Sequence, residues 1–147
     1  MTKFHQILLA EDDADDRELF KEALLLVDPS IRLAMVDNGE KLMSHLKTST
    51  VIPDYIFLDL NMPRKNGKEC LAEIRQNDQT LGVPVIIYTT SASLIDIEET
   101  FRAGASCFVR KPSTFNELTT LLKKLISSSS HLFSARAQKR SSFVFNA

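Results

Sequence analysis

The chain has 147 residues, of which 44% are hydrophobic and 25% charged, and its formal net charge is −1. This length suits one domain with a core of its own, needing neither a disulfide nor a structural metal. The near-neutral charge excludes a basic surface over the whole molecule, so direct nucleic-acid binding is not expected. The first residues lack a signal-type apolar segment, and no apolar run reaches membrane length, which favours a cytoplasmic protein without a membrane contact. Cys70 and Cys107 form no C-x-x-C pattern and are expected to stay reduced.

Five short apolar runs rich in β-branched residues alternate with amphipathic stretches. The runs, predicted to be strands, cover residues 4–10, 31–36, 54–59, 83–89 and 107–110. Helical spacing of apolar residues predicts helices over 15–27 and 40–47.

Three further helices are predicted from their end signals. Asn66 followed by Glu69 resembles a capping box, and Thr114 with Glu117 opens a helix that ends near residue 126. A helix from about residue 94 should stop at Gly104, because glycine tolerates a left-handed C-cap best.

This alternation predicts an α/β fold, a doubly wound five-stranded parallel sheet with five helices. The expected strand order is the flavodoxin-like 2-1-3-4-5. In such sheets, ligands bind outside the carboxyl ends of the strands, so these ends are where a functional site is expected.

The composition changes after residue 126, which divides the chain into a domain over 1–126 and a tail over 127–147. The tail is rich in serine, has no acidic residue and carries a formal charge of +3, which leaves −4 for the domain. It begins with the composition of a flexible connector and ends in Phe143-Val144-Phe145. The two readings are an idle terminus and a segment that docks on a neighbouring copy or a partner.

Acidic residues follow two strands that are neighbours in the expected order. Glu11 and Asp12 end the first strand, and Asp59 ends the third. Carboxylates so close together raise one another's pKa unless a cation neutralises them. Hard oxygen ligands with room for water suit Mg²⁺, and a carboxylate beside such an ion is a plausible nucleophile toward a phosphoryl group.

Two more groups end the remaining strands. Thr89 ends the fourth strand, where its hydroxyl could reach a phosphoryl oxygen, and Lys111 follows the fifth, where it supplies fixed positive charge. Alone, each would be read as a solvated loop residue, and Asp15 and Asp16 are read as complements of a helix dipole. Acid, acid, hydroxyl and lysine at four successive strand ends favour a phosphorylation site.

Residues 4–126 resemble response-regulator receiver domains. The resemblance rests on six motifs in order: Ile7-Leu-Leu-Ala-Glu-Asp-Asp, Phe57-Leu-Asp-Leu-Asn-Met-Pro, Asn66-Gly, Pro84-Val-Ile-Ile-Tyr-Thr, Ala103-Gly-Ala and Arg110-Lys-Pro. The first motif and Thr89-Thr90-Ser91 are most similar to stand-alone receivers that work with bacteriophytochromes or hybrid histidine kinases.

The resemblance implies that Asp59 accepts a phosphoryl group from a histidine kinase or a histidine phosphotransfer protein. Asp12 would bind Mg²⁺ directly, Glu11 through water, and Asn61 through its backbone carbonyl. Thr89 would be the switch hydroxyl, Lys111 the phosphate-binding lysine, and the bond to Pro112 cis. Such a protein is not an enzyme beyond its own phosphorylation and dephosphorylation; its output is a changed affinity for an unidentified protein target or a homodimer.

Two positions depart from the common pattern, and the tail after residue 126 is a third departure that this pattern does not cover. Thr90 is larger than the residue usual after the switch threonine and should restrict access to the site. Phe108 has no hydroxyl, so a tyrosine-type hydrogen-bond switch is unavailable. The surface between the fourth and fifth strands is still the expected output surface.

Three other classes fit less well. A phosphatase of the haloacid-dehalogenase type needs a nucleophile and a general acid two residues apart before a Gly-Thr or Gly-Val turn, which is missing after Asp12. A flavin-binding electron carrier needs a glycine- and hydroxyl-rich phosphate loop, where this chain has acids that would repel phosphate. A nucleic-acid-binding tail would rest on three cationic residues without a recognition helix.

Overall fold

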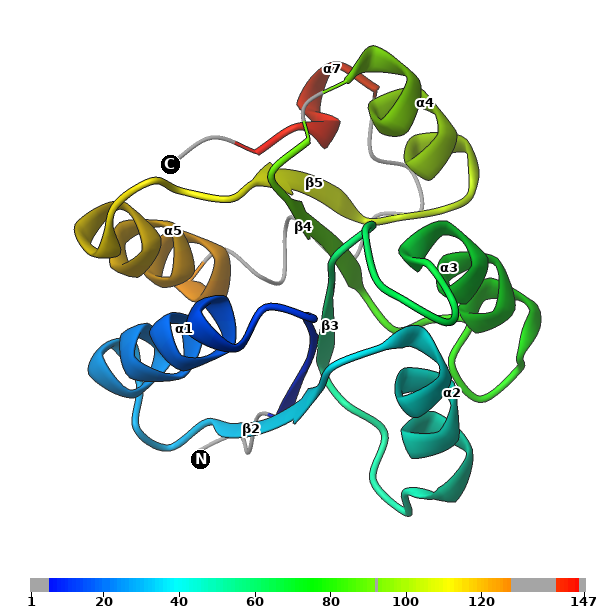
Figure 1. Ribbon diagram of the computed structural model, residues 1–147, viewed down its shortest axis with the longest axis horizontal. Helices are drawn as coiled ribbons and strands as arrows, with labels where there is room; N and C mark the ends of the chain where they lie inside the picture. Colours follow the sequence, from blue (N-terminus) through cyan, green and yellow to red (C-terminus); the bar gives the residue numbers. More distant parts are fainter. Residues whose placement is uncertain (1–5, 92, 128–139, 146–147) are drawn as a thin grey trace.

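A computed structural model describes residues 6–91, 93–127 and 140–145. In these ranges, five parallel strands form one sheet in the order β2-β1-β3-β4-β5 (Figure 1). The strands are β1 (Gln6–Ala10), β2 (Arg32–Val36), β3 (Tyr55–Leu58), β4 (Val85–Thr89) and β5 (Cys107–Arg110). The predicted fold class and strand order are confirmed.

The predicted helices are present, with bounds that differ by a few residues. They are α1 (Ala14–Val27), α2 (Gly39–Thr48), α3 (Gly67–Gln76), α4 (Leu94–Arg102) and α5 (Phe115–Ser127). The Asn66–Glu69 capping box is formed in both directions at the start of α3. Gly104 has a φ of 94°, so it provides the left-handed residue that the sequence predicted after α4.

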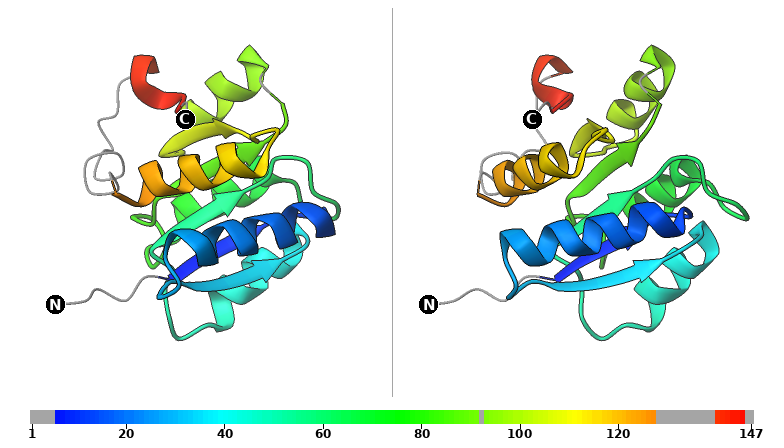
Figure 2. Two further views of the ribbon diagram at one scale, coloured as in Figure 1. Left: turned by 90° about the vertical axis from the view of Figure 1, so that its left-hand side faces the viewer. Right: turned by 60° about the vertical axis from the view of Figure 1, so that its left-hand side comes forward.

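The helices cover both faces of the sheet (Figure 2). Helices α1 and α5 pack on one face around Phe20, Phe57 and Leu122. Helices α2, α3 and α4 pack on the other face around Leu71 and Phe108. Every residue of β3 and β4 is buried, as expected for strands in the middle of a doubly covered sheet. This packing leaves the carboxyl ends of the strands as the edge from which polar side chains project.

The last described segment returns to the sheet. A short helix α7 (Arg140–Phe143) lies beside α4 and β5, and Val144 forms a bridge with Phe108 of β5 (Figure 1). Docking on a neighbouring copy or a partner was one of the two readings of this apolar end, and the structure packs it on its own domain instead. Residues 128–139 of the predicted tail lie outside the described residues. In the part of the chain that the structure describes, no helix is both long and apolar enough to cross a membrane.

Candidate phosphorylation and metal site

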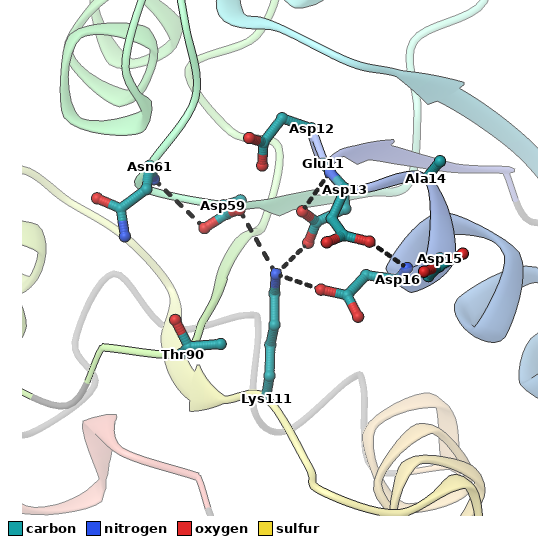
Figure 3. Close-up of a pocket in the computed structure, with 10 residues that line it drawn as sticks. All are labelled: Glu11, Asp12, Asp13, Ala14, Asp15, Asp16, Asp59, Asn61, Thr90 and Lys111. Atoms are coloured by element: carbon teal, nitrogen blue, oxygen red, sulfur yellow. Dashed lines mark hydrogen bonds and ion pairs between the residues drawn. The ribbon is translucent and has the colours of Figure 1, made fainter.

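A cavity of about 600 Å³ opens at the carboxyl ends of β1, β3 and β5 (Figure 3). Its walls come from the β1–α1 loop and the start of α1, from the residues after β3, and from the residues after β4 and β5. They are Glu11, Asp12, Asp13, Ala14, Asp15, Asp16, Asp59, Asn61, Thr90 and Lys111. The cavity is therefore where the fold predicts a ligand to bind.

Asp59 is held at the floor of this cavity by the sheet itself. Its backbone N–H donates to the carbonyl of Ala10 at 3.0 Å, which extends the β1–β3 pairing by one residue. The side chain is almost fully buried, and its Oδ1 accepts the N–H of Asn61 at 3.3 Å. Buried apolar residues fill β3 up to Leu58, so the strand delivers one carboxylate to the cavity in a fixed position.

Three carboxylates converge here. Glu11, Asp12 and Asp59 each offer one oxygen, and these oxygens lie within 4.8 Å of one another. Glu11 is fully buried, Asp59 nearly so, and Asp12 is exposed. A cluster of hard oxygen donors open to water on one side fits a divalent cation such as Mg²⁺.

The ammonium group of Lys111 supplies positive charge to this cluster of carboxylates. Its Nζ lies 2.5 Å from Oε1 of Glu11, 3.0 Å from Oδ2 of Asp16 and 3.5 Å from Oδ2 of Asp59. The ammonium also sits 5.7 Å from the ring centroid of Tyr88, within range of a cation–π contact. Its backbone N–H donates to the carbonyl of Thr89 at 2.8 Å, so the residue is tied to β4 as well.

Burial and crowding shift the pKa values in this cluster. Burial, aided by the nearby charge of Asp59, raises the pKa of Glu11 from 4.5 to about 8, although Lys111 opposes the shift. Burial also raises the pKa of Asp59, against the opposing charge of Lys111. Burial by itself would lower the pKa of Lys111, but its bonds to Glu11 and Asp16 outweigh that effect and raise it. The metal-free site thus holds its lysine charged and binds protons more tightly than free carboxylates do.

The structure brings together five of the six predicted site residues. Glu11, Asp12, Asp59, Asn61 and Lys111 all line the cavity. Thr89 ends β4 as predicted but is fully buried and does not line the cavity, and its hydroxyl oxygen accepts the N–H of Ser91 at 3.4 Å. Its neighbour Thr90 faces the cavity instead (Figure 3).

The expected cis bond between Lys111 and Pro112 is wrong, because no peptide bond in the described ranges is cis. The trans form is the intrinsically favoured one even before proline, and the Lys111 side chain reaches the acidic cluster from it.

Two contributors to the site were not predicted. Asp16, read as a helix-dipole residue, forms an ion pair with Lys111 across the cavity. Its place three residues after the N-cap Asp13 was the available signal, since the first turn of α1 faces the strand ends. Gly67 contacts the backbone of Asp59 so closely that a Cβ there would lie 2.4 Å from the Asp59 carbonyl oxygen. The sequence indicated a helix start at Asn66 and Asn66-Gly as a family motif, and neither predicts this contact.

Comparison with known proteins agrees with this geometry. Residues 7–123 match the response regulator receiver domain family. Over 122 residues the chain is 31% identical to response regulator Rcp1 of Synechocystis sp., covering 80% of this chain and 83% of Rcp1. It is 32% identical to the transcriptional regulatory protein CpxR of Escherichia coli over 122 residues, but spans only 49% of CpxR.

Solved structures extend the similarity. The phosphorylated cyanobacterial phytochrome response regulator RcpA superposes with a TM-score of 0.81 at 28% identity, covering 92% of this chain and 98% of RcpA. The Mn²⁺-bound form of Rcp1 superposes with a TM-score of 0.76 at 28% identity, covering 92% of this chain and 97% of Rcp1.

The chain therefore belongs to the response regulator receiver family, the phosphoacceptor modules of two-component signalling. Its partner is accordingly of the histidine kinase class, and its own chemistry is that of a signalling module rather than of a turnover enzyme.

The raised pKa of Glu11 predicts a stability that depends on pH and on magnesium. Between its ordinary value of 4.5 and about 8, the folded state binds the Glu11 proton more tightly than the unfolded state does. The free energy of unfolding of the metal-free protein should therefore fall over this window as pH rises, by up to about 5 kcal/mol. Because cation binding needs the deprotonated carboxylate, stabilisation by Mg²⁺ should grow over the same window.

Urea denaturation at both ends of the window, with and without Mg²⁺, measures both effects. Glu11→Gln should flatten the dependence, whereas Glu18→Gln, at an exposed position on α1, should leave it as in the wild type. Equal slopes for both variants would refute the assignment to Glu11.

Proposed function

We propose that Asp59 accepts a phosphoryl group from the phosphohistidine of a histidine kinase or a histidine phosphotransfer protein. A carboxylate oxygen of Asp59 attacks phosphorus, the P–N bond to the donor imidazole breaks, and the imidazole takes a proton as it leaves. The product is an acyl phosphate on Asp59. The proposal rests chiefly on one observation: a buried carboxylate at a strand end with Lys111 Nζ 3.5 Å from its oxygen and two more carboxylates beside it.

We further propose that the bound cation is Mg²⁺, held by Glu11, Asp12, Asp59 and the backbone carbonyl of Asn61. It would neutralise charge on the transferring phosphoryl group. Lys111 would add fixed positive charge on the opposite side, exchanging part of its contact with Asp16 for a phosphoryl oxygen.

Thr89 is proposed as the switch residue. Because its hydroxyl is buried and does not line the cavity, it must turn toward a phosphoryl group to contact it. That movement would carry the signal into β4 and to the surface formed by α4 and β5. Affinity for a protein target, or self-association, would change there only if the two states differ in their contacts with the phosphoryl group.

The similarity to Rcp1 and to the phytochrome response regulator RcpA supports a phytochrome-type or hybrid histidine kinase as the donor. Such a kinase module uses ATP, which places the reaction in the cytoplasm.

Labelling with acetyl phosphate tests the function. With Mg²⁺, the protein should take up a single phosphoryl group that survives acid and is lost in alkali or hydroxylamine. Asp59→Asn should abolish the label, because an amide is not a nucleophile of this kind. Asp15→Asn, which changes a carboxylate lining the same cavity outside the three-carboxylate cluster, should keep it. Stoichiometric labelling of Asp59→Asn would contradict the proposal.

A further inference from the structure

The free edge of the sheet beside β5 carries a segment from the end of the chain. In the order β2-β1-β3-β4-β5, strand β5 has a neighbouring strand on one side only. On its other side, Val144 forms a parallel bridge with Phe108, and the N–H of Phe145 donates to the carbonyl of Phe108 at 2.9 Å. Residues 140–145 therefore provide a hydrogen-bond partner for part of the β5 edge, which would otherwise be open to another strand.

The side chains of this segment fit both faces of the sheet. Phe143 is fully buried and joins the core on the α4 side, with its ring centroid 5.2 Å from that of Phe101 and 6.2 Å from that of Phe108. Phe145 packs against the core on the α5 side, where it lines a cavity with Leu121. The segment thus crosses the edge of the sheet with one phenylalanine on each side.

A charged contact fixes the start of the segment. Nε of Arg140 lies 2.6 Å from Oε1 of Glu98 on α4, and both side chains are partly exposed. This pair lies at the rim of the apolar contact and sets the direction in which the segment lies along β5. Positive charge on the segment and a carboxylate on the acceptor match the opposite net charges of tail and domain.

We propose that the β5 edge between α4 and α5 is a binding groove for a Phe-Val-Phe segment, and that residues 140–145 are its intramolecular occupant. Any protein that uses this surface must first displace them. This inference rests on the proposed function only in one respect, namely that the surface covered by residues 140–145 is the output surface of the receiver. The groove itself is independent of phosphorylation chemistry.

The occupant also lies beside the phosphorylation site. The cavity that Phe145 lines is also lined by Lys111 and Pro112, which follow β5 directly. The groove and the site lysine therefore share one strand and its following loop. A partner that displaces the segment would bind next to the residue that contacts Asp59.

The probe for this proposal is a fluorescent peptide of residues 139–147, Lys-Arg-Ser-Ser-Phe-Val-Phe-Asn-Ala. A tethered segment competes at an effective concentration on the order of millimolar, so the wild-type chain should bind the peptide weakly. The full-length double variant Phe143→Ala/Phe145→Ala should bind it at least about 10-fold more tightly, because its own segment no longer fills the groove. Ser141→Ala, at an exposed position of the same segment, should behave as the wild type. Equal affinities for the wild type and the double variant would overturn the proposal.

A milder variant guards against loss of folding. Arg140→Glu should also release the segment from the groove. Adding Glu98→Arg should restore its binding, because the ion pair is formed again with reversed charges. Failure of the second change to restore closure would contradict the assigned direction of the segment. Labelling with acetyl phosphate, run in parallel, reports the site separately from the groove.

Hydrogen exchange distinguishes a groove filled by the chain's own segment from a groove filled by the segment of a second copy. The amide of Phe145 should be protected in the wild-type chain to the same extent at low and high protein concentration. Protection that disappears on dilution would mean that the segment belongs to a second copy, and would overturn the intramolecular assignment.

Discussion

Replacing Lys111 with methionine is expected to lower the free energy of unfolding of the metal-free protein by about 3 kcal/mol near pH 8. Only 9% of the Lys111 side chain is exposed, and its ammonium group contacts Glu11, Asp16 and Asp59. Methionine fills a similar volume but leaves two buried carboxylates without a positive partner. Urea denaturation followed by circular dichroism measures the loss, which should shrink when saturating Mg²⁺ supplies the missing charge.

Arg110→Met is the matched control, because Arg110 is the exposed residue directly before Lys111. It removes one positive charge at the end of β5, next to Lys111, without touching the acidic cluster and should change stability by less than about 0.5 kcal/mol. If the two variants lose the same stability, or if Mg²⁺ does not reduce the loss in Lys111→Met, the charge balance described here is wrong.

Replacing Gly67 with alanine is expected to cost about 2 kcal/mol of stability and to slow labelling of Asp59. The new Cβ would lie 2.4 Å from the carbonyl oxygen of Asp59 and 2.7 Å from Cα of Leu60, and both are backbone atoms. The N–H of Gly67 also donates to the carbonyl of Leu60 at 3.0 Å, so α3 cannot simply move away. The backbone after β3 must shift, and the Asp59 carboxylate shifts with it.

Gly82→Ala provides the comparison for this variant, because nothing lies within 4 Å of a Cβ built at Gly82. It changes the same residue type and should leave both stability and labelling close to the wild type. Thermal unfolding and the rate of acetyl phosphate labelling can be measured on the same samples. Normal labelling by Gly67→Ala would show that the contact does not position Asp59.

The sheet could be predicted from the sequence because its signals are local. Buried strands such as Val85–Thr89 are continuous apolar runs, and the helices between them carry period and capping signals. Strand order then brings Glu11, Asp12, Asp59 and Lys111 to one edge without further information. The acidic cavity followed from topology and from the identity of the residue that ends each strand.

Other parts of the site depend on distances that sequence spacing does not encode. Asp16 contacts Lys111 across 95 positions of sequence, and this contact depends on how α1 leaves β1. Thr89 was placed at the correct strand end, but the face on which its hydroxyl lies depends on the alternation of side chains along β4. The close approach of Gly67 to Asp59 requires the path of the β3–α3 loop to be known.

At the end of the chain, too, one part was predictable from the sequence and another was not. Phe143 and Phe145 stood out as apolar residues in a polar segment, and their tendency to be buried was evident from composition. Their acceptor could not be read from the sequence, because the expected strand order leaves two edges, β2 and β5, and the sequence does not say which one the segment contacts. The contact between Phe143 and Phe101 is a property of the folded domain.

Charge balance at the site is what links its parts. Three carboxylates, those of Glu11, Asp16 and Asp59, contact one lysine, and a fourth, that of Asp12, lines the same cavity. Burial, with a smaller contribution from the charge of Asp59, raises the pKa of Glu11, and the excess of negative charge fits a divalent cation. A phosphoryl group brings further negative charge, so its acceptance at Asp59 depends on both the cation and Lys111.

Chemical trapping of the phosphorylated residue tests the central proposal most directly. The protein is labelled with acetyl phosphate and Mg²⁺, then treated with borohydride, which reduces an aspartyl phosphate to homoserine. Mass spectrometry of the resulting peptides should locate homoserine at position 59 and at no other aspartate. Homoserine at Asp12, Asp13, Asp15 or Asp16 with an unchanged Asp59 would contradict the assignment of Asp59 as the phosphoryl acceptor.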